Sequence, residues 1–211
     1  EDQFRNLPAD ARRLTGPLFW LHGDESRERL EMYVDKVAEG GNGCFTAESR
    51  PHSDWLGEGW FRDLGICLDA AKRNNLQMWI FDEKWWPSGE VAGKVPVQYG
   101  SKFLEAATHD ATGPGSFSVD TGDRVVAVIA GRDTGAGIDG ATLVDLTGST
   151  RDGKLTWAEV PAGAWKVMVF TWRFNEGNRR IVDGASRDAI DWYIRTVYQP
   201  HYDRFPDDFG K

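Results

Sequence analysis

The sequence is poor in sulfur and has no excess of positive charge, and both shortages narrow the possible classes of protein. Only two cysteines and three methionines occur in 211 residues, and the cysteines are Cys44 and Cys67. Two cysteines in apolar segments favour buried thiols over a disulfide framework. The 33 acidic residues outnumber the 25 lysines and arginines, which gives a net charge of −8. Since nucleic acids and anionic membranes bind through basic patches, we expect neither as a partner.

Long apolar runs and nucleotide-binding motifs are also missing. No run approaches the roughly 18 apolar residues of a membrane span. No Gly-x-Gly-x-x-Gly and no Walker sequence follows a predicted strand, which argues against a nucleotide site. The four histidines, His22, His52, His109 and His201, lack the spacing of a zinc site. His201 lies on an apolar helical face and is expected in the core, whereas His52 and His109 are expected at the surface or at caps.

A strand followed by a helix recurs along the first hundred residues. The predicted strands cover 18–21, 43–47 and 76–81, and each is followed by an apolar stripe at helical spacing. The third helix is the shortest and is predicted over 95–105. Three such units about thirty residues apart are typical of a parallel sheet.

The composition changes after residue 107. Residues 108–178 are rich in Gly, Thr and Val, with short strand patterns divided by turns such as Asp152-Gly153 and Pro161-Ala162-Gly163. Helical periodicity then returns in residues 179–211. We therefore expect a first domain of three βα units over 1–107, an inserted small antiparallel β domain over 108–178, and a return to the α/β domain over 179–211.

This order predicts an α/β fold, a partial (β/α)8 barrel with an inserted β domain. A small open sheet is the alternative. A complete barrel needs about 250 residues, and half of one leaves an open strand edge. We therefore expect the missing half of the barrel, in a longer chain or a partner, or a second copy of the chain in a homo-oligomer.

The segment that follows the third strand carries the strongest functional signal. Asp82 and Glu83 come directly after an apolar run, and Trp85 and Trp86 follow in the loop. Proteins with parallel sheets usually place their chemistry at the carboxyl ends of strands. Flat indole faces with N–H donors suit a sugar ring, which has C–H faces and hydroxyl edges. The competing interpretation is that both tryptophans are core residues and the acids cap a helix.

Three further candidates lie at the ends of the first two strands. Trp20 and His22 end the first strand, and Glu48 ends the second. All three could face the same edge of the sheet and bind substrate. Trp20 fits a binding site and a core position equally well.

Several segments resemble one enzyme family in the same order. Residues 18–24, Leu-Phe-Trp-Leu-His-Gly-Asp, are similar to the opening strand of bacterial α-L-rhamnosidase-like glycoside hydrolases. Residues 81–89, Phe-Asp-Glu-Lys-Trp-Trp-Pro-Ser-Gly, resemble the third-strand segment of that group. Trp157, followed by Pro161-x-Gly163-x-Trp165, resembles its turn in the inserted domain. The resemblance covers nearly the whole chain, as the N-terminal half of a catalytic barrel.

The resemblance implies a hydrolase acting on plant or bacterial polysaccharide, secreted or periplasmic, with an oligosaccharide or polysaccharide as partner. Two departures bear on activity. His22 stands where the group usually has Asn, a difference that bears on the sugar preference. The resemblance also implies that a catalytic Asp-Glu strand follows residue 211, so we expect the catalytic pair to be incomplete in this chain.

Asp82 and Glu83 are the candidate catalytic carboxylates, but their spacing points to another role. Glycoside hydrolysis generally requires two carboxylates about 5–10 Å apart across the scissile bond. Neighbouring residues of a strand point to opposite sides, so Asp82 and Glu83 are expected to bind sugar hydroxyls or a cation, for which the resemblance suggests Ca²⁺. The alternatives to a glycoside hydrolase are a non-catalytic carbohydrate-binding protein and a structural domain without a ligand.

Overall fold

The computed structural model describes residues 6, 11, 15–177 and 179–210. The chain divides into two compact units. Unit 1 comprises Glu1–Gly100 and Gly177–Lys211, and unit 2 comprises Ser101–Glu176. Within these described ranges, no helix is both long and apolar enough to cross a membrane.

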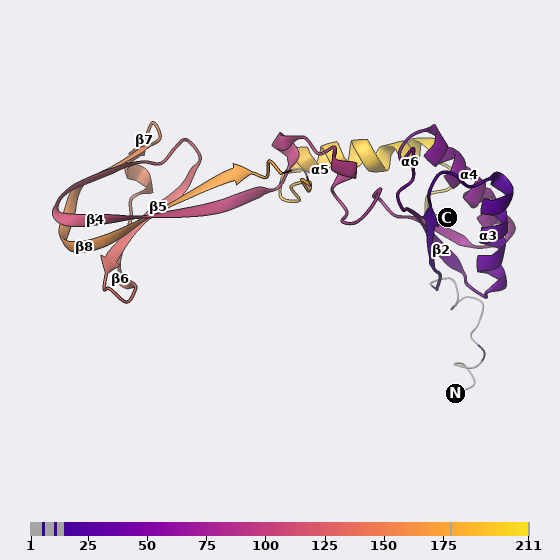
Figure 1. Ribbon diagram of the computed structural model, residues 1–211, viewed down its shortest axis with the longest axis horizontal. Coiled ribbons are helices and arrows are strands. Elements are labelled where there is room, and N and C mark those ends of the chain that lie inside the picture. The colour runs from indigo at the N-terminus through magenta and orange to yellow at the C-terminus, as the bar shows by residue number, and fades with distance from the viewer. Residues whose placement is uncertain (1–5, 7–10, 12–14, 178, 211) are drawn as a thin grey trace. The chain divides into compact units, whose positions relative to one another are not determined.

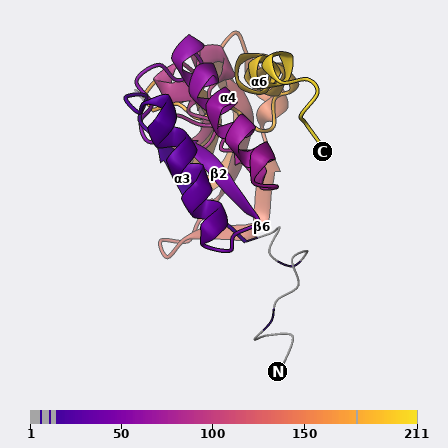
Figure 2. The same ribbon diagram turned by 90° about the vertical axis from the view of Figure 1, so that its right-hand side faces the viewer.

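Unit 1 is built on a three-stranded parallel sheet. Its strands β1 (Leu18–Leu21), β2 (Cys44–Ser49) and β3 (Gln77–Ile80) lie in the order β1-β2-β3. Helices α3 (Arg27–Glu39) and α4 (Glu58–Arg73) connect them and lie over β2 in Figure 2. The predicted strands and the first two predicted helices are therefore confirmed.

Local sequence explains where these helices begin and what they bury. The Ser26 side chain accepts a hydrogen bond from the Arg29 amide and caps α3. The apolar sides of α3 and α4 pack against the inward residues of the sheet in one core. The largest fully buried side chains of that core include Phe45 and Trp60.

The prediction of a partial (β/α)8 barrel is wrong. Strand residues outnumber helical residues, and most of them belong to the antiparallel sheet of unit 2. In the described part of unit 1 the parallel sheet stops at β3, and its three strands do not close. Barrel strands are buried on both faces, whereas Trp79 in β3 is 49 % exposed.

The third predicted helix, over 95–105, is also wrong. The segment instead forms the short 3₁₀ turns η1 (Val91–Gly93) and η2 (Val97–Tyr99) and then enters strand β4 at Lys102. Pro96 and Gly100 both adopt extended backbone conformations on either side of η2, so the segment forms one short turn and no longer helix.

The last helical segment of unit 1 is irregular. It consists of α5 (Arg187–Tyr193), one π-helical stretch η4 (Ile194–Tyr198) and α6 (Gln199–Arg204). The Ser186 side chain caps α5 by accepting from the Ala189 amide. A π-helical turn shifts the angular position of the side chains that follow it.

Unit 2 is an antiparallel sheet with its own core. Strands β4 (Lys102–Asp120) and β8 (Lys154–Phe174) run side by side through the unit (Figure 1). The sheet order is β4-β8-β5-β6, and the short β7 also pairs with β8. The other elements are β5 (Val125–Asp133), β6 (Ile138–Asp145), the turn η3 (Thr147–Ser149) and β7 (Thr150–Arg151).

One of the two predicted turns in this region is a turn, and the other lies inside a strand. Asp152 and Gly153 both have positive φ and join β7 to β8, as expected of a two-residue hairpin. The segment 161–163 instead continues β8 past an irregularity in its pairing with β4. Gly113 and Gly163 face each other there, so the two strands bend together rather than ending.

Candidate functional site

Asp82 lies just past the carboxyl end of β3 and accepts hydrogen bonds from three hydroxyls. Ser88 donates to Oδ1 at 2.8 Å, and Tyr193 and Tyr198 donate to Oδ2 at 2.9 Å and 2.5 Å. Burial by itself raises the pKa of Asp82, but the hydroxyl donors outweigh it and hold that pKa below its ordinary value. Burial and the adjacent carboxylate raise the pKa of Tyr198 to about 12. At neutral pH the site therefore contains a carboxylate and neutral phenols.

A cavity of about 1020 Å³ opens beside this carboxylate. It runs along β3 and the C-terminal helical segment of unit 1, and Asp82 contributes to its lining. Its size and its largely apolar walls are those of a small-molecule site. The aromatic side chains of the lining are Trp79, Tyr198, Tyr202, Phe205 and Phe209.

Glu83 points elsewhere and has a structural role. Its side chain is fully buried, and its Oε1 accepts from the amides of Gly89 and Val91 at 2.9 Å and 2.7 Å. Val91 and Ala92 have positive φ, an uncommon conformation for residues with a side chain. Oε2 is buried without a hydrogen-bond partner. Burial is the largest effect on this group and raises the pKa of Glu83 despite the amide donors.

The two candidate carboxylates therefore do not converge on one point. Asp82 binds hydroxyls of the C-terminal helical segment, whereas Glu83 binds the backbone of its own loop. A Ca²⁺ ion takes six to eight oxygen ligands directed at a common centre. The pair does not fit a shared calcium site.

Trp20 and Glu48 lie side by side on β1 and β2. They are register partners, and the Trp20 indole donates to Glu48 Oε2 at 3.0 Å. Arg50 binds the other oxygen of Glu48 at 3.0 Å, and its guanidinium lies 5.6 Å from the Trp20 ring. Trp20 is 53 % exposed, so it is not a core residue, while Glu48 is buried. The Trp20 ring is therefore exposed on the face of the sheet opposite α3 and α4, and its indole N–H is already bonded to Glu48.

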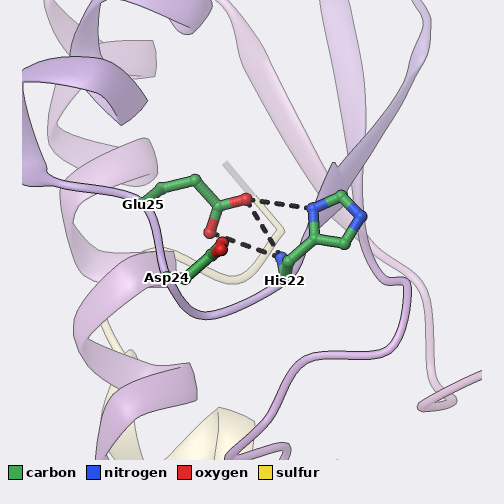
Figure 3. A group of neighbouring side chains, drawn as sticks. All are labelled: His22, Asp24 and Glu25. Atoms are coloured by element: carbon green, nitrogen blue, oxygen red, sulfur yellow. Dashed lines mark hydrogen bonds and ion pairs between the residues drawn. The ribbon is translucent and has the colours of Figure 1, made fainter.

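His22 belongs to a separate cluster at the start of α3 (Figure 3). Within the described ranges, His22, Asp24 and Glu25 are the one group of three residues whose potential metal ligands lie within 4.8 Å of one another. Glu25 accepts from the amides of His22 and Gly23, and from His22 Nδ1 at 3.1 Å. Burial would raise the pKa of Glu25, but these donors lower it. These bonds between Glu25 and residues 22–23 order the loop before the helix.

Trp85 and Trp86 lie in the loop after β3, outside the lining of the cavity. Lys84 Nζ is 5.3 Å from the Trp85 ring. Trp86 is 66 % exposed, and its carbonyl accepts from Arg179 at 3.0 Å. Arg179 also binds Glu90 through two nitrogens, which lowers the pKa of that carboxyl. The loop thus presents the Trp86 ring to solvent on a firmly held backbone.

The histidines differ in how well their positions were predicted. His201 is buried, as expected, and its Nε2 accepts from the Trp60 indole at 2.9 Å. His52 was expected at the surface or at a cap. The prediction of a surface position is wrong, because the side chain is fully buried. Its Nε2 lies 3.1 Å from Asp63, and its Nδ1 accepts from the Asp54 amide. Spacing along the chain gave no sign of this partner.

The sequence does not single out several residues of the site, among them Trp79, Tyr193 and Tyr198. Trp79 was read as part of a strand buried on both faces, but β3 is an edge strand in the described sheet and leaves the indole exposed. The apolar spacing of the C-terminal segment places Tyr193 and Tyr198 on one helical face and gives no partner for their hydroxyls. The one feature of the sequence that could have indicated their role is the phenol hydroxyl, because a buried tyrosine hydroxyl usually bonds to an acceptor.

No protein-family model matches the sequence, and no curated protein is similar to it. The fold is similar to part of the solved structure of a rhamnosidase from Novosphingobium sp. PP1Y. The TM-score is 0.66 at 12 % sequence identity. The match covers 100 % of this chain and 38 % of the rhamnosidase chain. The resemblance found in the sequence thus has a structural counterpart, which at this identity concerns the fold.

Proposed function

We propose that this chain is the carbohydrate-binding part of a rhamnosidase-like glycoside hydrolase and that a neutral sugar binds in the cavity along β3. The observation that carries this proposal is the position of Asp82, an ionised carboxylate in the lining of a largely apolar cavity that also contains five aromatic side chains. Aromatic faces such as Trp79 can stack on the C–H face of a sugar. Asp82 Oδ1 has one lone pair beyond the one that accepts from Ser88, and this lone pair can accept from a sugar hydroxyl. The fold similarity to a rhamnosidase supports the choice of sugar.

We further propose that the chain binds sugar without hydrolysing it. The Glu83 carboxyl is enclosed by its own loop, and its orientation differs from that of Asp82. Neither stereochemical route of glycoside hydrolysis is then available to this pair, because each needs two carboxyl groups facing the same bond. This observation favours the carbohydrate-binding alternative over a self-sufficient enzyme.

The proposal is tested by titrating the protein with L-rhamnose and by incubating it with 4-nitrophenyl α-L-rhamnoside. We expect saturable binding in NMR spectra and no release of nitrophenol above a buffer blank. Trp79→Ala should weaken binding about five- to thirtyfold, since an aromatic contact of this kind contributes on the order of 1–2 kcal/mol.

Trp86→Ala is the matched control, because it removes an exposed indole that does not line the cavity. If binding were lost in Trp86→Ala and retained in Trp79→Ala, the sugar would lie on the loop and not in the cavity. Turnover that disappears in Asp82→Asn would instead show that the chain is a complete enzyme. The absence of any binding would reject the carbohydrate proposal.

A further inference from the structure

A second cluster of aromatic residues lies in unit 2, on one face of the β4–β8 pair. Trp172 and Phe174 stand edge to face with their ring centroids 5.1 Å apart. Leu104 and Lys102 on β4 are their register partners. The Leu104 side chain is 65 % exposed, so the cluster continues into open apolar surface.

Two cations contact these rings. The Arg124 guanidinium carbon lies 5.0 Å from the Trp172 centroid and 5.4 Å from that of Phe174. Lys102 Nζ lies 5.8 Å and 5.7 Å from the same two rings. We call Lys102, Leu104, Arg124, Trp172 and Phe174 together the cation–aromatic patch. Contact with two rings restricts the Arg124 side chain before any ligand binds. A ligand that binds Arg124 therefore has a smaller loss of side-chain entropy to overcome.

We propose that the cation–aromatic patch binds a sugar bearing a carboxylate, such as a uronic acid residue of an acidic oligosaccharide. The planar guanidinium of Arg124 matches a carboxylate with two parallel N–H donors. Leu104 and the exposed part of Trp172 offer an apolar surface to the C–H face of the sugar ring. In a chain with a net charge of −8, a polyanion is repelled overall, so binding requires a local cation such as Arg124.

The opposite face of the β4–β8 pair also has an arginine next to an aromatic ring, but this arginine is not available to bind a carboxylate. Arg173 lies 5.1 Å from the Phe103 ring, but it also forms an ion pair with Glu105. The carboxylate of Glu105 occupies the guanidinium and cancels its charge. Arg173 is one residue from Trp172 on β8, which makes it a matched control.

This site does not depend on the sugar cavity of unit 1. All five residues of the patch belong to unit 2, and the ligand differs in charge from the neutral sugar proposed for the cavity. The two proposals can therefore fail separately.

The test compares trigalacturonate with the neutral galactotriose in titrations of the full chain, followed by calorimetry and by NMR. We expect trigalacturonate to bind at least about tenfold more tightly and its affinity to fall with added salt. Arg124→Gln should remove most of that preference, with a loss of at least about tenfold in affinity. Arg124→Lys keeps the charge without the planar fork and should give an intermediate loss. Arg173→Gln should change the affinity by less than about twofold.

Amide spectra of each variant establish that it is folded before the comparison is made. Equal affinity for the acidic and neutral trisaccharides would overturn the proposal. An Arg173→Gln loss as large as that of Arg124→Gln would also overturn it, because the effect would then follow total charge and not this patch. The amide shifts that trigalacturonate causes should map to residues 101–176, which separates the patch from the cavity.

Discussion

At the scale of single residues, Asp82 and Glu83 show how two adjacent carboxyl groups acquire different properties. Three hydroxyl donors keep Asp82 ionised next to a cavity. Glu83 is fully buried, and one of its oxygens has no partner, so its neutral form is favoured. The difference arises because successive side chains leave the chain in opposite directions. One residue is available to a ligand, and the other holds the loop.

The role assigned to Glu83 predicts different outcomes for two substitutions. Glu83→Gln keeps an acceptor for the Gly89 and Val91 amides and should leave the free energy of unfolding at neutral pH unchanged or higher. Glu83→Ala removes the acceptor from buried donors and should lower it by about 2–4 kcal/mol. Chemical denaturation measures both. Asp207→Asn, at an exposed acid, is the control for loss of charge.

The pH dependence of stability in the same variants checks the direction of the Glu83 pKa shift. Because the folded pKa of Glu83 is raised above the ordinary 4.5, its contribution to stability is full below that value and declines as the pH rises through the folded pKa. The difference in stability between Glu83→Gln and the wild type should therefore shift in favour of the variant as the pH increases from 4 to 7. A shift in the other direction would mean that the buried carboxyl is held ionised.

The sequence indicated part of this site and not the rest. The acids after an apolar strand and the neighbouring tryptophans could be recognised because they are close together in the chain. Tyr193 and Tyr198 could not be assigned to Asp82, since more than a hundred residues separate them. Contacts of that range depend on the docking of the C-terminal helical segment, which periodicity does not specify.

At the scale of elements, the pairing of the long strands β4 and β8 requires that their backbones come very close at one point, Gly113. A Cβ atom added to Gly113 would lie 2.1 Å from the Pro161 carbonyl oxygen. Only glycine fits there, because the obstacle is backbone and cannot rotate away. The same segment, Pro161-Ala162-Gly163, was predicted to be a turn because proline and glycine commonly end strands.

This close approach predicts that Gly113→Ala destabilises unit 2. We expect a loss of about 2–4 kcal/mol, comparable to other substitutions that force a backbone shift. Gly140→Ala is the control, because nothing lies within 4 Å of its added Cβ. Thermal unfolding followed by the near-ultraviolet signal of Trp157 and Trp165, which pack edge to face, measures the effect. Equal melting temperatures in the two variants would show that the strands can move apart at this point.

At the scale of the whole molecule, the chain contains two separate hydrophobic cores. The core of unit 1 includes Phe45, Trp60 and Tyr193, and that of unit 2 includes Leu155, Trp157 and Trp165. Neither core contains a residue of the other unit. A segment with its own core and its own closed set of strand pairings meets the requirements for independent folding.

We therefore predict that residues 101–176 fold when produced alone. The fragment should show a dispersed amide spectrum and a cooperative thermal transition, with amide shifts close to those of the same residues in the full chain. The fragment carrying Gly113→Ala should melt lower than the one carrying Gly140→Ala. A spectrum typical of an unfolded chain would show that unit 2 needs unit 1 for its stability.

The sequence by itself determined the alternation of strand and helix in the first part of the chain, the antiparallel β region after it and the acid–tryptophan segment. These features rest on periodicity, turn residues and short-range order, all of which act locally. Only the tertiary structure decided that β3 is an edge strand of the described sheet, that Glu83 is buried and that Asp82 binds two distant tyrosines. Those outcomes depend on which surfaces dock, and docking is set by packing between segments far apart in the chain.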